Sequence, residues 1–358
     1  MTILLGNAVS LLFYSVLFRE SKKFVVVLGG IQLFLLLALR SEYYGTDAIY
    51  YLNGYDYISS MTFDQMLGAL NSNLLNTAHL VYPYSYENGW VLLNWLFSAG
   101  HLGYRTLMVF LSGVTAASFS LFAYRFSKDP GITMFVLSCL SPLLYSFFIL
   151  RQTFALCICL LALPFLLKRR PVPFALMVLV AFLFHRSALI FLILYPLCGR
   201  RATKKVFQIG LLVFAILLAA SYTVFPKVIA LLFELVGKAH FQISFSWNNL
   251  IALQLLIVVC CLFFDIDDIS KDPTDNLALW AILASLLTYT VMLNNEVLAR
   301  ANEYLWIFVA LLIPAMLQRL DPEMRALVRI LVSILLLGFL AYEVHGSDLD
   351  PYLAYSSL

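Results

Sequence analysis

Long apolar runs separated by short polar breaks occupy most of the chain and predict a bundle of membrane-crossing helices. A helix needs about 20 predominantly apolar residues to cross a bilayer, and runs approaching that length recur from one end to the other. Twelve spans are predicted, near residues 3–18, 24–39, 106–123, 132–149, 152–167, 172–184, 187–198, 206–225, 249–264, 277–293, 302–317 and 327–341. The expected fold is all-α, a polytopic membrane protein whose single helical domain covers residues 1–358.

Two places in this pattern predict something other than an ordinary crossing. The apolar run at 89–100 has only 12 residues, a length typical of a re-entrant or interfacial segment. The runs at 172–184 and 187–198 flank a polar interruption, and we interpret them as a hairpin with His185 and Arg186 at its tip. A periplasmic or re-entrant region is therefore expected over about 40–105.

Composition agrees with a membrane protein and excludes a soluble globular domain. The chain is 62% hydrophobic and 12% charged, and its mean hydropathy is +0.90, outside the usual range of soluble domains. The six cysteines lie in apolar runs and none is paired with a histidine at metal-ligand spacing, so no disulfide or zinc framework is expected. The first apolar run follows no basic segment and carries no cleavage signature, and is interpreted as a retained span.

Basic residues divide unevenly between the two sides of this topology. One set of alternate loops holds 16 of the 23 Lys and Arg residues, and the positive-inside rule assigns that side to the cytoplasm. Both termini and the 40–105 region are then outside. The charges that lie inside or at the mouth of a span fall on the outer side, where ionisable groups are costly and indicate a functional site. They are Arg40, Asp47, Glu87, Arg151, His185, Arg186, Glu296 and Arg300.

Four sequence clusters carry these outer charges. Arg40 and Asp47 flank a glycine turn followed by tyrosines, and Thr46 or Asp47 is expected to cap a short helix there. Glu87 precedes the re-entrant segment, and irregular backbone at membrane depth survives only against protein or a wet cavity. Arg151 heads an apolar helix, where a guanidinium suits a phosphate ligand. His185 is a candidate base, or a candidate hydrogen-bond donor to a phosphate group.

The fourth cluster is Glu296, Arg300 and Tyr304, whose spacing places them on one helical face. A plain intrahelical ion pair explains the first two, whereas an inward-facing pair would position Arg300 and leave Tyr304 to contact a ligand. No phosphate-binding glycine loop and no HExxH motif is present. The acidic stretch at 265–268 is interpreted as a solvated cytoplasmic loop, so no metal site is expected.

In this order the clusters resemble the EpsG family of Wzy-type polysaccharide polymerases. The resemblance covers roughly residues 40–305, and each motif is weak alone while the ordered set is specific. Trp90 and Asn88 are mild departures from the tyrosine and proline common in the family. The matching residues are Arg40, Gly45-Thr46-Asp47, Tyr51, Glu87-Asn88-Gly89-Trp90, Arg151-Gln152, His185-Arg186-Ser187-Ala188, Arg300 and Tyr304.

The resemblance implies a membrane glycosyltransferase of GT-C-like architecture in the bacterial inner membrane. Its activity would be the polymerisation of undecaprenyl-pyrophosphate-linked oligosaccharide repeat units on the periplasmic face, as for O-antigen or capsule. An acceptor sugar hydroxyl would attack the donor's anomeric carbon, and undecaprenyl pyrophosphate would leave without a metal or other cofactor. Membrane lipid and a chain-length regulator protein are candidate partners, and no nucleic acid is expected.

Residue roles follow from this chemistry. The base is predicted to be His185 or Glu87, with Asp47 third. Pyrophosphate would be bound by Arg151 and Arg300, with Arg40 and Arg186 behind them, because placed cations stabilise a leaving anion. Contacts to sugars are predicted for Tyr51, Tyr304, Trp90 and Gln152. Arg105, Lys227 and Lys238 are interpreted as ordinary loop charges.

The sequence is also compatible with other functions. An O-antigen ligase shares the chemistry and differs in its acceptor. A lipid-linked oligosaccharide flippase would also use arginines, although its charges should line a cavity open to both faces. A polyprenyl-phosphate glycosyltransferase that adds one sugar and a non-enzymatic scaffold are further alternatives.

Overall fold

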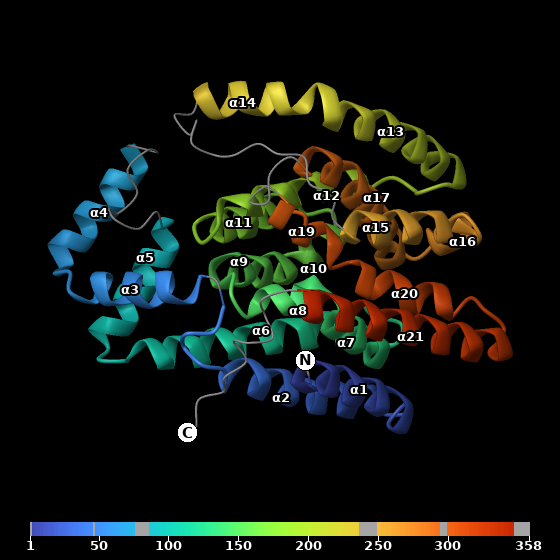
Figure 1. Ribbon diagram of the computed structural model, residues 1–358, viewed down its shortest axis with the longest axis horizontal. Helices are drawn as coiled ribbons and strands as arrows, with labels where there is room; N and C mark the ends of the chain where they lie inside the picture. The colour runs from blue at the N-terminus through green and yellow to red at the C-terminus, as the bar shows by residue number, and fades with distance from the viewer. Residues whose placement is uncertain (1, 46, 76–85, 236–248, 294–298, 347–358) are drawn as a thin grey trace. The chain divides into compact units, whose positions relative to one another are not determined.

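The computed structural model consists of α-helices joined by short connections (Figure 1). It describes residues 2–45, 47–75, 86–235, 249–293 and 299–346, and within these ranges no β-strand is found. The chain divides into two compact units, one of residues 1–163, 175–189 and 317–358 and the other of residues 164–174 and 190–316. The all-helical class is as predicted, and a single domain over 1–358 stays a prediction.

The first unit contains a bundle of antiparallel helices held together at small residues. The Cα of Gly30 lies so close to α6 that a Cβ would stand 2.5 Å from Ser120 Oγ, and Gly131 lies equally close to Ser15. Small residues of this kind let membrane helices approach each other where apolar burial gives no advantage over lipid. The bundle helices are α1 (Thr2–Leu17), α2 (Lys22–Ala38), α6 (Tyr104–Phe126), α7 (Pro130–Cys139), α8 (Ser141–Ser146), α9 (Leu150–Leu161) and α21 (Pro322–Gly346).

Polar contacts join the helices at one end of this bundle. Arg329 on α21 donates from Nη2 to Ser15 Oγ at 2.8 Å, and its Nη1 lies 3.7 Å from Asp129 Oδ2. Gln318 Nε2 donates to the carbonyl of Lys128 at 3.0 Å. The sequence assigns these loops to the basic, cytoplasmic side.

Three helices cover the other end of the bundle. They are α3 (Ala48–Ser59), α4 (Phe63–Leu75) and α5 (Asn88–Ala99), and their aromatic side chains form one buried cluster with the start of α6 and with Leu150. Side-chain-to-backbone bonds fix the arrangement, because Trp95 Nε1 donates to the Met61 carbonyl at 3.3 Å and Asn88 Nδ2 to that of Leu70 at 3.2 Å. Helix α4 was not expected from the sequence.

The apolar runs fold as helices, but several are interrupted. The run at 132–149 breaks at Leu140, whose backbone is extended, and resumes with Pro142 in the first turn of α8. The run at 187–198 begins as the 3₁₀-helix η1 (Arg186–Ile193) and becomes α12 (Leu194–Cys198). Proline lacks the backbone N–H that a continuous helix needs, which accounts for such a break.

Four helices in the described chain are long and apolar enough to cross a membrane, namely Tyr104–Phe126, Lys204–Thr223, Pro273–Met292 and Pro322–His345. Other apolar helices of 10–17 residues accompany them. The protein is therefore membrane-integral, while twelve crossings and a GT-C-like arrangement stay predictions.

The second unit is organised around α17, which is buried along most of its length. Asp272 caps this helix by accepting hydrogen bonds from the backbone N–H groups of Thr274 and Asp275. Asp265 caps α16 in the same way, so the acidic stretch at 265–268 has a structural role. The helices of this unit are α10 (Leu163–Leu167), α13 (Lys204–Thr223), α14 (Phe225–Leu235), α15 (Asn249–Cys261), α16 (Ile266–Ile269), α17 (Pro273–Met292), α19 (Glu303–Trp306) and α20 (Val309–Leu317), together with α12. Helix α11 (Pro171–Phe182) begins in this unit and continues into the first.

Candidate active site

Glu87 lies at the centre of the strongest polar cluster in the first unit. It occupies the N-cap position of α5, yet its side chain makes no capping hydrogen bond. Instead, Arg151 Nη1 donates to Glu87 Oε2 at 2.5 Å, and the backbone N–H of Arg186 donates to Oε1 at 3.3 Å. The side chain of Glu87 is only 12% exposed and that of Arg151 only 16%, so the pair is largely shielded from solvent.

A close backbone contact beside this pair explains the glycine of the Glu-x-Gly motif. The N–H of Gly89 donates to the carbonyl of Leu183 at 2.7 Å. A Cβ at position 89 would stand 2.7 Å from that oxygen and 3.0 Å from its carbonyl carbon, closer than a real side chain tolerates. Glycine thus lets the start of α5 meet the end of α11, which brings Glu87 to Arg186.

Aromatic rings surround the guanidinium of Arg151. Its Cζ lies 4.9 Å from the ring centroid of Tyr86 and 5.8 Å from that of Tyr51, distances at which cation–π attraction operates. The rings of Tyr51 and Tyr86 are stacked, with centroids 6.3 Å apart. Trp90 packs against Tyr51 with centroids 5.5 Å apart and is almost fully buried.

Burial makes the hydroxyls of Tyr51 and Tyr86 harder to ionise. It raises the pKa of Tyr51, an effect that the positive charge of Arg151 opposes, and it also raises the pKa of Tyr86. Both groups are therefore neutral hydrogen-bond donors around pH 7, and Tyr86 donates to the carbonyl of Tyr50 at 2.6 Å.

Asp47 belongs to the same neighbourhood. Its carboxylate acts electrostatically on Tyr51, and although it is the N-cap residue of α3 its side chain makes no capping hydrogen bond. The capping role predicted for Asp47 is therefore wrong, because its side chain forms no hydrogen bond to the first amides of α3. Thr46, the other predicted cap, lies outside the described residues. Gly45 has a φ of +104° and packs against Phe148, which only glycine accommodates readily.

His185 ends the α11 segment of the predicted hairpin. Its backbone N–H bonds to Ala181 and its Nδ1 lies 2.6 Å from Ser187 Oγ, a contact that orients the imidazole ring. His185 and Arg186 are both half-buried. The hairpin tip thus delivers a histidine next to the Arg186 amide that contacts Glu87.

Arg40 has a different environment. Its side chain is almost fully buried, Nη1 donates to the carbonyl of Ser146 at 3.4 Å, and Cζ lies 5.7 Å from the Phe147 ring. The carbonyl of Arg40 accepts from Arg105 Nη1 at 2.5 Å. Arg105, interpreted from sequence as an ordinary loop charge, has a structural contact that its position alone did not reveal.

Comparison with known protein families assigns the chain to one of them. A family model described as the EpsG family matches residues 23–357, nearly the whole sequence. The chain belongs to the EpsG family. No curated protein and no solved structure matches it. Membership supports a polysaccharide polymerase-like membrane protein, and it agrees with the resemblance read from the ordered motifs.

Four further residues of the predicted site, namely Gln152, Arg300, Tyr304 and Glu296, are not among the residues that contact Glu87 or the Arg151 guanidinium in the contacts described above. Gln152 is buried within α9. Arg300 is half-buried in the second unit, and Tyr304 is fully buried there. Glu296 lies outside the described residues, so its predicted stacking with Arg300 stays a prediction, as do the assigned roles of these side chains.

Sequence reasoning missed Asn302, which stands between Arg300 and Tyr304. Its Oδ1 accepts from Gln254 Nε2 at 3.0 Å and from Ser285 Oγ at 2.6 Å. Its Nδ2 donates to the Ser285 carbonyl at 2.8 Å. A fully buried amide with three such bonds fixes the backbone that carries Arg300, and an asparagine inside an apolar run was the available signal.

Metal-ligating side chains do not gather in the described parts of this EpsG chain. No group of three or more His, Cys, Asp or Glu side chains close enough to hold a metal ion is found there. The six cysteines are free thiols in or beside apolar helices. The polar cluster of the first unit is built from the Glu87 carboxylate, the Arg151 guanidinium, the Arg186 backbone amide and tyrosines, with the Asp47 carboxylate close enough to act on Tyr51.

Proposed function

We propose that this protein is a polysaccharide polymerase that joins undecaprenyl-pyrophosphate-linked oligosaccharide repeat units on the periplasmic face of the bacterial inner membrane. The observation that carries the proposal is the Glu87–Arg151 pair with its wall of tyrosines. Three segments distant in sequence contribute to it, and the backbone amide of Arg186 adds a fourth. Membership of the EpsG family supports the reaction class.

In this proposal Arg151 binds the pyrophosphate of the donor. The guanidinium is held by Glu87 Oε2 and by the faces of Tyr51 and Tyr86, so little reorganisation is needed when charge develops on the leaving group. Preorganised cations aimed at developing charge are among the largest contributions to catalysis. Arg300 is the second proposed pyrophosphate ligand, with Arg40 and Arg186 as further candidates.

Among the three candidate bases, His185 suits the geometry best. Both oxygens of Glu87 are engaged, by Arg151 and by the Arg186 amide, and we assign Glu87 to positioning Arg151. His185 is half-buried and its ring is oriented by Ser187, as a base that accepts the proton of a sugar hydroxyl should be. Asp47 remains the third candidate.

The bonding changes are those of a glycosyl transfer. The acceptor hydroxyl forms a bond to the anomeric carbon of the donor and gives its proton to the base. The bond between that carbon and the pyrophosphate oxygen breaks, and undecaprenyl pyrophosphate leaves with the bonding electrons. Tyr51 and neighbouring aromatic side chains would contact the sugars through ring faces and hydroxyls.

The decisive experiment incubates the purified full-length protein with lipid-linked repeat units in the presence of EDTA. Products that grow into a ladder despite the chelator support a metal-free polymerase. A single transfer without growth would instead identify a ligase, and translocation without a new bond would identify a flippase.

Alanine variants of the proposed pyrophosphate ligands, measured in the same chain-extension assay, test whether the site carries the activity. Arg151→Ala and Arg300→Ala are expected to abolish chain extension while the protein still inserts into membranes. Lys227→Ala is the matched control, because Lys227 is an exposed cation of α14 outside the cluster. Ladders of unchanged length from the arginine variants would refute the assignment.

A further inference from the structure

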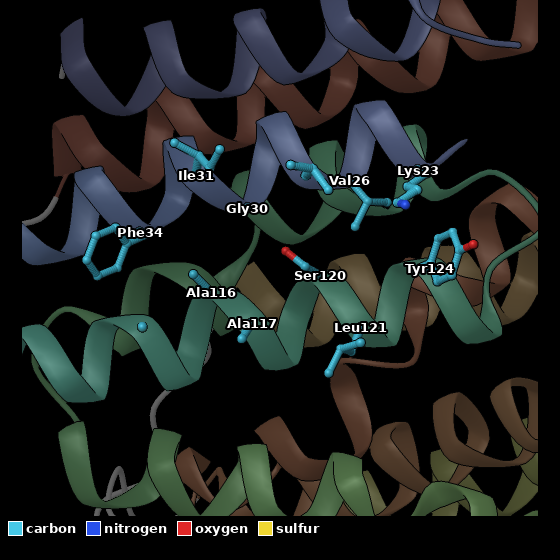
Figure 2. A pocket seen from close by; sticks show the side chains of 12 residues that line it. Lys23, Val26, Gly30, Ile31, Phe34, Ala116, Ala117, Ser120, Leu121 and Tyr124 are labelled. Atoms are coloured by element: carbon cyan, nitrogen blue, oxygen red, sulfur yellow. The ribbon is translucent and has the colours of Figure 1, made fainter. Parts of the chain in front are cut away.

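A groove outside the polar cluster runs along the surface of the first unit between α2 and α6 (Figure 2). Its volume is about 650 Å³, within the range of ligand-binding cavities. The floor is made by small residues of α2 and α6, and Phe34 stands at one end while Lys23 and Tyr124 stand at the other (Figure 2). The small floor residues are Gly30, Gly113, Ala116, Ala117 and Ser120.

The length of the groove matches one leaflet of a bilayer. Its lining extends from Lys23 to Phe34 on α2 and from Gly113 to Tyr124 on α6. At 1.5 Å per residue each stretch spans ~16 Å, about half of the ~30 Å hydrocarbon thickness. A transmembrane helix of a partner would need a surface along the full thickness, whereas an acyl chain of one leaflet fits this length.

Charge distinguishes the two ends of the groove. Lys23 lines one end. The exposed Lys22 and Arg125 lie at the same end of α2 and α6, and the turn before α2 adds Arg19 and one acid, Glu20, so this end is net positive. The other end is closed by the Phe34 ring and contains no charged lining residue. An amphiphile with an anionic headgroup and an apolar chain matches this distribution.

We propose that the α2–α6 groove binds one anionic phospholipid, with an acyl chain along Ala117 and Gly113 and the headgroup phosphate at Lys23. Lysine binds phosphate as a point charge, and Tyr124 adds an amphipathic ring at headgroup level. By the positive-inside rule this end faces the cytoplasm, so the lipid belongs to the inner leaflet.

The proposed lipid is distinct from the polyprenyl substrate. The Glu87–Arg151 pair lies with the cluster at the Tyr104 end of α6, while Lys23 and Tyr124 mark the opposite end. Helix α6 has 23 residues, so its ends are roughly 35 Å apart. The groove therefore serves as a lipid site whose occupancy can be measured without the polymerase reaction.

The test uses full-length protein in nanodiscs that contain phosphatidylglycerol carrying a photoactivatable diazirine in one acyl chain. A parallel sample contains phosphatidylcholine with the same labelled chain, and cross-linked peptides are mapped by mass spectrometry. Phosphatidylglycerol is expected to label the stretches 26–34 and 113–124 preferentially. Lys23→Gln should lower this preference about fivefold, and Lys22→Gln, next to the groove but not lining it, should lower it less.

A second variant fills the groove without disturbing the bundle. Ala117 is exposed, so Ala117→Leu extends into open space and should remove most of the labelling at 113–124. Ala215→Leu on α13 is the matched control, because Ala215 is also an exposed helical alanine. Retained labelling in Ala117→Leu would overturn the site.

Three other results would overturn the proposed occupant. Equal labelling by the two phospholipids would show that the headgroup is not recognised. Displacement of phosphatidylglycerol by undecaprenyl phosphate would assign the groove to the polyprenyl chain. Labelling seen in nanodiscs but absent in native membranes would indicate that a protein helix covers the groove.

Discussion

Arg151 donates a 2.5 Å hydrogen bond to Glu87 from a position 64 residues further along the chain. Both side chains are largely buried. Glu87 does not use its side chain to cap α5, and its partner Arg151 belongs to a different helix. Removing one member of a buried ion pair leaves the other charge uncompensated, which is far more costly than removing both. This asymmetry makes the pair testable.

Glu87→Ala is expected to destabilise the protein by about 3 kcal/mol, because the Arg151 charge would remain buried without its carboxylate. The double variant Glu87→Ala/Arg151→Ala should recover much of that loss and still produce no ladder. Thermal denaturation in detergent and the chain-extension assay measure the two quantities. Additive losses of stability in the double variant would show that the two groups are not coupled.

Gly89→Ala should impair chain extension by displacing the segment that carries His185. A Cβ 2.7 Å from the Leu183 carbonyl oxygen forces backbone to move, and overpacking of this kind costs about 1–3 kcal/mol. Gly68→Ala in α4 is the control, since its Cβ would meet nothing within 4 Å. That control should gain up to about 1 kcal/mol from helix propensity and keep full activity, and equal behaviour of the two variants would contradict the close-contact interpretation.

Asn302→Ala should cost about 2 kcal/mol of stability, because Gln254 and Ser285 lose a buried hydrogen-bond partner. If Asn302 acts by positioning Arg300, the variant lowers kcat/KM in the wild-type background and has little further effect in an Arg300→Lys background, which keeps a cation at position 300 and residual activity. Asn249→Ala, at an exposed position of α15, is the control. An equally large drop in kcat/KM in the Arg300→Lys background would assign Asn302 to another role.

Stability should decline at high pH partly through Tyr51 and Tyr86. Burial raises the pKa of both hydroxyls above the ordinary value of 10.0, so the folded state disfavours the ionised form. The stabilising contribution is complete below pH 10 and is lost as the pH rises above it. Melting temperatures measured from pH 7 to 11 should fall more steeply for the wild type than for Tyr51→Phe, and identical slopes would count against this origin.

The pattern of apolar and charged residues along the chain was enough to predict much of the helical architecture and to select the candidate site residues. Apolar runs located the helices at 24–39 and 106–123 to within a few residues, because each run must satisfy its own backbone hydrogen bonds in lipid. The turn at Gly45 and the short helix after Asp47 also follow from local rules. Glu87, Arg151 and His185 were selected by the cost of placing charge at membrane depth.

Local pattern failed where neighbouring segments decide the outcome. The break at Leu140, where Pro142 follows, and the 3₁₀ geometry of η1, which contains no proline, were not predicted from the apolar pattern. Asp47 looked like a helix cap, but its side chain does not bond to the α3 amides. Arg105 looked like a loop charge, and its contact with the Arg40 carbonyl required α2 and α6 to be side by side.

The sequence by itself determined that this is a helical membrane protein of the EpsG type with charge gathered on one predicted side. Those conclusions depend on hydropathy, on residue spacing and on the order of motifs, all of which are properties of the chain read locally. Only the tertiary structure decided that Glu87 pairs with Arg151, that Gly89 must be glycine and that Asn302 bonds to Gln254 and Ser285. Each of these is a contact between segments far apart in sequence, and its geometry depends on how complete helices pack.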